Sequence, residues 1–203
     1  DWYVDGISGD DADAGTSIAP FKTIGAAITA ASNGQKIIIG TGVYNEQVAT
    51  LNDYYYFYAD GNVIMSASGL SQATCVYNCR SDQFHGIHFI NADMIYYLNN
   101  YLYRPQFHDC IFTNILALTT TPTATYYNWG AYLIEFQRCR FQDCTLTSQA
   151  YIKYIKFYDC IFMNSPLGID VLGTGYVTTN QYWDIKRCWF GRSDGYANPF
   201  VLW

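Results

Sequence analysis

The segment Phe107-His-Asp-Cys110-Ile-Phe112 contains the pattern that decides the fold: an apolar residue, a small apolar residue and a closing phenylalanine. Two positions later comes Asn114, a residue type that tolerates the left-handed backbone of tight corners. The pattern recurs four more times, in residues 84–89, 136–141, 157–162 and 185–190. The closing phenylalanines are 23, 29, 21 and 28 residues apart.

This irregular interval separates two repeat architectures. Helical solenoids keep a stricter period, whereas a β-helix accommodates insertions in the turns between its strands. We therefore predict an all-β fold, a single-stranded right-handed parallel β-helix of about seven coils with a short N-terminal capping α-helix. We expect one domain over residues 1–203, with a strand, an acidic loop and the cap helix in 1–35 and the coils in 36–203.

The repeat also predicts which residues point inward. Its last three positions alternate as in a strand with one buried face, so the small residue and the phenylalanine should enter the core. The Asn or Asp that follows should stack between coils and exchange amide hydrogen bonds. The predicted core is Phe89, Cys110, Phe112, Cys139, Phe141, Cys160, Phe162, Cys188 and Phe190, and the predicted corner ladder is Asn91, Asn114, Asp143 and Asn164.

The N-terminal segment has a different sequence pattern from the repeats. Residues 20–31 have the spacing of an amphipathic helix that begins at Pro20 and stops at Asn33-Gly34, and such a helix would cover the first coil. Tyr3-Val-Asp-Gly-x-x-Gly9 and Ile37-x-Ile39-Gly-x-Gly-x-Tyr44-x-Glu46 resemble the start of pectate-lyase-like β-helix proteins. That superfamily includes polysaccharide lyases and hydrolases, phage tailspikes and secreted surface proteins, so the resemblance implies the fold and leaves the activity open.

Composition narrows the classes of partner. The net charge of −6 argues against nucleic acid, and no apolar run is long enough to span a membrane. Charged residues are 14% of the chain and aromatic residues 18%, with 20 tyrosines. Because the chain begins at Asp1 without an initiator methionine, we expect a mature exported product, located extracellularly, on a cell surface or on a virion.

The residues that most resemble a catalytic set precede the repeat cysteines. They are Asp109, Arg138, Asp159 and Arg187, which alternate in sign and should lie outside the core. Two carboxylates and a basic residue suit glycoside hydrolysis, but alternate coils would place Asp109 and Asp159 roughly 9.6 Å apart with Arg138 between them. We expect a charge ladder that fixes coil register, and no catalytic centre.

The cysteines do not form a metal signature, because no second Cys/His pair stands at the required spacing. We expect the repeat cysteines to be buried thiols, and Cys75, Cys79 and Cys144 to be better placed for disulfides if the protein is exported.

Two further groups of polar residues suggest sites. His85, His88 and His108 should lie on neighbouring coils, where stacking alone explains their closeness. The nearest approach to a calcium site is Asp5, Asp10, Asp11 and Asp13, which lack the terminal glutamate of a calcium hand. We expect no cofactor and no metal, with an acidic turn as the default and a bound calcium ion as the alternative.

The tyrosine clusters and the C-terminal end are not explained by the repeat. Exposed aromatic side chains stack on sugar rings and form protein interfaces, and an uncovered apolar β-helix end invites head-to-tail pairing. The residues predicted to make these contacts are Trp2, Tyr54, Tyr56, Tyr96, Tyr101, Tyr103, Tyr127, Trp129, Phe200 and Trp203.

The favoured function is therefore a non-catalytic structural protein. It would assemble with itself, as an oligomer or a filament, or contact surface polysaccharide. The alternatives are a polysaccharide lyase or glycoside hydrolase of the tailspike or pectate-lyase-like kind, and an isolated domain of a longer tailspike.

Overall fold

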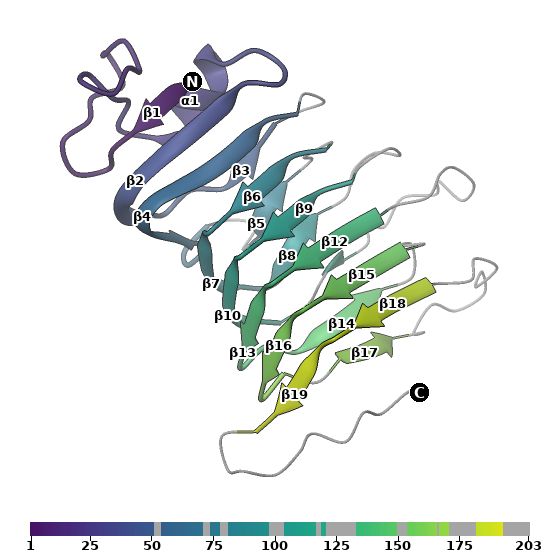
Figure 1. Cartoon of the computed structure of the whole chain (residues 1–203). Helices are drawn as coiled ribbons and strands as arrows, with labels where there is room; N and C mark the ends of the chain where they lie inside the picture. Colours follow the sequence, from purple (N-terminus) through teal and green to yellow (C-terminus); the bar gives the residue numbers. More distant parts are fainter. Residues whose placement is uncertain are drawn as a thin grey trace.

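A computed structural model describes residues 1–50, 54–70, 74–77, 81–97, 104–116, 119–120, 133–149, 154–165, 167–170 and 182–192. All strand pairs within its two sheets are parallel, and the chain winds through them as a right-handed β-helix (Figure 1). The coil number of about seven stays a prediction. The fold is the one that the resemblance to pectate-lyase-like proteins implies.

The coils have three faces. The first face contains the N-terminal half of β4 (Tyr56–Ser66), then β6 (Gln83–His85), β9 (Gln106–His108), β12 (Leu133–Gln137), β15 (Tyr154–Tyr158) and β18 (Tyr182–Lys186). The second face contains the C-terminal half of β4, then β7 (His88–Ala92), β10 (Ile111–Ile115), β13 (Arg140–Gln142), β16 (Ile161–Met163) and β19 (Trp189–Gly191). The third face contains β3 (Val48–Ala49), β5 (Thr74–Tyr77), β8 (Met94–Tyr97), β11 (Thr119–Thr120), β14 (Leu146–Gln149) and β17 (Leu167–Asp170).

Two columns of stacked phenylalanines fill the core between the first and second faces. Neighbouring rings within a column lie 4.5–5.3 Å apart, and rings of the two columns meet edge to face. Such ring pairs stabilise the fold beyond what the burial of the rings contributes. The predicted core residues are buried, except that Cys188 and Phe190 on the last described coil are only half-buried. The columns are Phe57, Phe84, Phe107, Phe136 and Phe157, and Phe89, Phe112, Phe141, Phe162 and Phe190.

The predicted corner ladder turns the chain from the second face toward the third. Its four members have φ between 49° and 56°, in the left-handed region that Asn and Asp tolerate. The Asn114 amide donates to Asn91 at 3.3 Å, and the Asn164 amide donates to Asp143 at 2.7 Å. We call this turn the second corner.

The repeat motif is not the single strand that its alternation predicted. A first corner divides it, because the residue before each motif cysteine also has a left-handed backbone, with φ of 53–56°. His108 therefore ends one strand and Ile111 begins the next, on a different face. Gly86 occupies the same position one coil earlier, with φ of 71°.

The cap helix α1 (Ile24–Ala30) lies at the N-terminal end of the β-helix beside β1 (Trp2–Val4) and β2 (Lys36–Tyr44) (Figure 1). The sequence predicted a start at Pro20, but the helix begins four residues later. The reason is that the Thr23 hydroxyl caps it by accepting the Ala26 N–H at 3.1 Å. It ends before the Asn33-Gly34 turn, as expected.

The motif around Tyr44 and Glu46 holds this cap on the first coil. The Glu46 carboxylate accepts the N–H groups of Ile24 and Gly25 at 3.1 and 3.0 Å, which satisfies two open donors at the start of α1. The Tyr44 hydroxyl accepts the Gly6 N–H and donates to the Gly40 carbonyl. The residues that carry the family resemblance therefore act in capping.

Candidate functional site

The outer surface of the first face carries a column with one polar side chain from each coil. Tyr58, His85, His108, Gln137 and Tyr158 occupy equivalent positions on β4, β6, β9, β12 and β15. The rings of Tyr58 and His85 stack at 4.3 Å, and those of His85 and His108 at 4.7 Å, within 9° of parallel. The rings therefore stack on one another along the helix axis and are half-buried. We call this set the first-face column.

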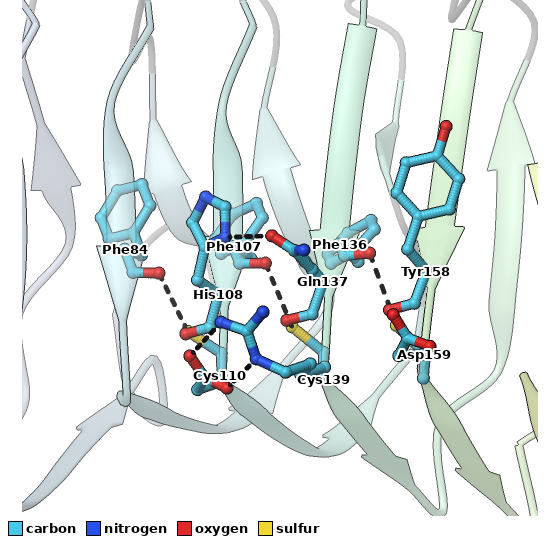
Figure 2. A network of polar contacts seen from close by, with 12 residues as sticks. Phe84, Phe107, His108, Cys110, Phe136, Gln137, Cys139, Tyr158 and Asp159 are labelled. Atoms are coloured by element: carbon cyan, nitrogen blue, oxygen red, sulfur yellow. Dashed lines mark hydrogen bonds and ion pairs between the residues drawn. The ribbon is translucent and has the colours of Figure 1, made fainter. Parts of the chain in front are cut away.

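The histidines of this column take part in side-chain hydrogen bonds. A ring nitrogen of His108 bonds the Gln137 side-chain oxygen at 3.0 Å (Figure 2). Burial, and then the neighbouring His108, lower the pKa of His85 to about 4. His88 does not join them, because it lies on the second face and bonds Thr113 at 3.0 Å. The three histidines therefore do not converge on one centre.

A charged cluster lies at the C-terminal end of the same face. Lys156 lies between Glu135 and Asp184 on adjacent strands, with its Nζ 3.9 Å from the Glu135 carboxylate. Asp184 accepts the Tyr158 hydroxyl at 2.7 Å and Lys186 at 2.9 Å. The bond to Asp184 raises the pKa of Tyr158 to about 12, and bonds from Tyr158 and Lys186 lower the pKa of Asp184.

The sequence analysis missed most of this cluster, although a signal for it exists. Tyr158 and Lys186 occupy the second position of the repeat, where His85 and His108 also stand. Following that position through every coil would have assembled the column. Lys156 and Asp184 lie two residues before it, on the same outward side of the strand.

The predicted catalytic candidates form two separate ion pairs on the first corner, beside this column. Arg138 donates two hydrogen bonds to Asp109 at 2.6 and 2.8 Å, and Arg187 donates two to Asp159 at 2.5 and 2.7 Å. These bonds lower the pKa of both carboxyl groups. A glycosidase acid needs a raised pKa, which is the opposite of the shift at both carboxyl groups. That these pairs fix the coil register stays a prediction.

Thiols lie directly behind the first corner. Each donates to the backbone carbonyl of the inward residue one coil earlier, as Cys110 does to Phe84 and Cys139 to Phe107, at 3.4 and 3.3 Å (Figure 2). Burial raises the pKa of Cys139, which keeps that thiol protonated. The five cysteines whose side chains are described, Cys110, Cys139, Cys144, Cys160 and Cys188, are all free.

This corrects the expectation for Cys144. It is a buried thiol that donates to Phe112 O at 3.4 Å, and it repeats at the second corner what the other thiols do at the first. The side chains of Cys75 and Cys79, its fellow disulfide candidates, lie outside the described residues.

The aspartates of the acidic loop accept hydrogen bonds from nearby backbone N–H groups. Asp5 accepts the N–H groups of Ile7 and Ser8, and Asp10 accepts that of Ala12. Asp11 accepts those of Lys22 and Thr23, at the start of the cap helix. Within the described part of the chain, no three His, Cys, Asp or Glu side chains, Asp13 included, are grouped as metal ligands.

The predicted aromatic contacts are only partly placed. Trp2 is half-buried in the cap, where its indole N–H donates to Gln35 at 2.8 Å and its ring stacks on Phe21. Tyr54 is exposed and contacts Tyr56 edge to face near the start of the first face. The Tyr96 side chain and all of Tyr101, Tyr103, Tyr127, Trp129, Phe200 and Trp203 lie outside the described residues.

One family model matches this chain, and the match covers the cap. Residues 7–51 match a family described as a protein of unknown function (DUF1565), and this segment contains the capping residues Tyr44 and Glu46. No curated protein matches the sequence. Among the residues that the structure describes, no helix has the length and apolar character needed to cross a membrane.

Two solved structures are similar to this chain. One is a rhamnogalacturonan lyase, with 13% identity and a TM-score of 0.49 over 95% of this chain and 62% of that one. The other is a pectin methylesterase from Aspergillus niger, with 15% identity and a TM-score of 0.37 over 94% and 83% of the two chains. The chain thus spans 62% of the length of the lyase.

Proposed function

We propose that this protein is a non-catalytic β-helix that binds a glycan chain along its first face. The observation that carries the proposal is the first-face column, which presents one planar polar side chain per coil. Coils repeat every ~4.8 Å, close to the length of one sugar unit in an extended glycan. Imidazole, amide and phenol groups at that interval suit paired sugar hydroxyls.

The charges of this face favour a ligand without strong charge of its own. Asp109 and Asp159 are paired with arginines, and Asp184 is bonded by Lys186. Lys36 lies over the Tyr58 ring at 5.7 Å, as a cation on an aromatic face. A neutral glycan would therefore leave these pairs intact.

A polysaccharide lyase or hydrolase is the second candidate, and one observation favours it. Glu135 and Asp184 flank Lys156 on three successive coils of the same face, so two carboxylates stand beside a base. Against this, the lowered pKa of Asp184 removes it as a proton donor at neutral pH.

The test is a calorimetric titration with neutral oligosaccharides of increasing length, together with an assay for released products. We expect affinity to rise with length until the chain spans the coils from Tyr58 to Tyr158. His108→Ala and Gln137→Ala should each weaken binding by about 3- to 10-fold, the value of one hydrogen bond. Gln142→Ala, an amide removed from the second face, is the matched control.

Failure to bind any oligosaccharide, or equal losses in the control, would overturn the glycan site. Released products whose yield falls in Glu135→Gln would replace it with the enzyme. We also propose an extracellular, cell-surface or virion setting, which is supported by the aromatic-rich, weakly charged composition and is checked by localising the protein in its source cells.

A further inference from the structure

An apolar stripe runs along the outside of the second face, away from the first-face column. It is formed by seven residues in register over six successive strand pairings: Val43, Ile64, His88, Ile111, Arg140, Ile161 and Trp189. Val43, Ile111, Ile161 and Trp189 are 62%, 38%, 44% and 53% exposed. Large apolar side chains aligned in water are typical of an interaction surface. We call this set the second-face stripe.

Trp189 gives the stripe a rigid anchor. Its indole lies across Gly191, in space that a Cβ at that position would need. The ring is thereby held against the backbone and is still about half exposed. Flat aromatic anchors of this kind contribute much of the binding energy at protein interfaces.

The second corner offers a matching surface on two coils of the β-helix. Leu116 is 59% exposed on the coil of Ile111. Asp143 is exposed on the coil of Arg140, and no ion pair of Arg140 occurs within the described residues.

On these two coils, therefore, an apolar side chain accompanies an apolar one and a carboxylate accompanies a cation. Each is a favourable contact if the two surfaces come from different molecules.

We propose that the occupant of the second-face stripe is the second corner of another copy of this chain. Rotation about an axis parallel to the β-helix keeps equal coils at equal heights, so Arg140 would meet Asp143 of the neighbouring copy. Two different surfaces make the contact, so it is heterologous, and a closing rotation without a rise along the axis joins the copies into a ring of parallel β-helices. The first face remains open in such a ring, so this proposal does not depend on glycan binding.

Sedimentation velocity and native mass spectrometry of the full chain test the ring. We expect a closed oligomer, and a dissociation constant raised at least ~100-fold by Arg140→Asp or by Asp143→Arg, because each places like charges together. The double variant R140D/D143R should restore assembly. Arg104→Asp makes the same charge change at an exposed position off the second face, and it should assemble normally.

Asp143→Arg also loses the bond from Asn164, so Trp189→Asp provides a second way to remove the contact without touching the corner. Circular dichroism confirms that each variant is folded. A wild-type monomer at all concentrations would overturn the proposal, as would an oligomer indifferent to Arg140→Asp and Trp189→Asp. A folded double variant that stays monomeric would refute the pairing of Arg140 with Asp143. Glycan titration of the same monomeric variants separates this failure from failure of the first-face site.

Discussion

Replacing Phe112 with alanine should destabilise the protein more than any substitution on its surface. The ring is fully buried, lies 5.3 Å from Phe89 and 5.0 Å from Phe141 in its own column, and meets two rings of the other column edge to face. A buried Phe→Ala change costs about 3–5 kcal/mol, and lost ring pairs place this site in the upper half of that range.

Phe190→Ala is the matched comparison. Phe190 ends the same column, is half-buried, and stacks on Phe162 at 4.5 Å. With less area buried, it should cost about 2 kcal/mol.

Urea unfolding followed by both fluorescence and circular dichroism measures the two free energies, and coincident transitions justify the comparison. A loss below ~2 kcal/mol for Phe112→Ala, or a loss no larger than that of Phe190→Ala, would refute the stacked core, because a central buried ring must cost more than a terminal one.

Three further outcomes follow from the same geometry. Denatured, unreduced protein should titrate with at least four free thiols, whereas Cys110, Cys139, Cys144 and Cys160 should react slowly in the native state; three disulfides would contradict the inward thiols. His85 has a pKa of about 4 when folded against the ordinary 6.5, so the unfolded state takes up its proton first as pH falls, and about 1–3 kcal/mol of stability should be lost between pH 6.5 and 4. His85→Gln should flatten that part of the stability profile, and an unchanged slope would assign the loss to other groups. Glu46→Ala should cost about 1–2 kcal/mol in urea unfolding by freeing two N–H donors of the cap helix, with Lys22→Ala as a control close to wild type.

The first corner shows where reading the sequence alone was insufficient. Asn and Asp in the sequence indicate a left-handed backbone, and the second corner was predicted from them. Arg138 and Arg187 do not, because a long side chain with positive φ is disfavoured. Their side chains form ion pairs with the aspartates of the preceding coils. These ion pairs occur at the same residues that have the unfavourable backbone conformation.

The first-face column illustrates the same limit. The equivalence of His85 and His108 is visible in the repeat, and their stacking was expected. That Tyr58, Gln137 and Tyr158 continue the column depends on strand register, which the loops between coils leave open because their lengths differ.

By itself, the sequence determined the parallel β-helix, the inward phenylalanines and cysteines, and the Asn/Asp corner. These follow from local rules, since every coil must bury the same kind of side chain and turn with a residue that tolerates positive φ. Only the tertiary structure decided that the motif spans two faces, that Arg138 pairs with Asp109, and that Val43, Ile111, Ile161 and Trp189 share one stripe. Those relations join different coils, and the physical reason is that contacts across coils depend on register and side-chain direction, which spacing along one chain does not specify.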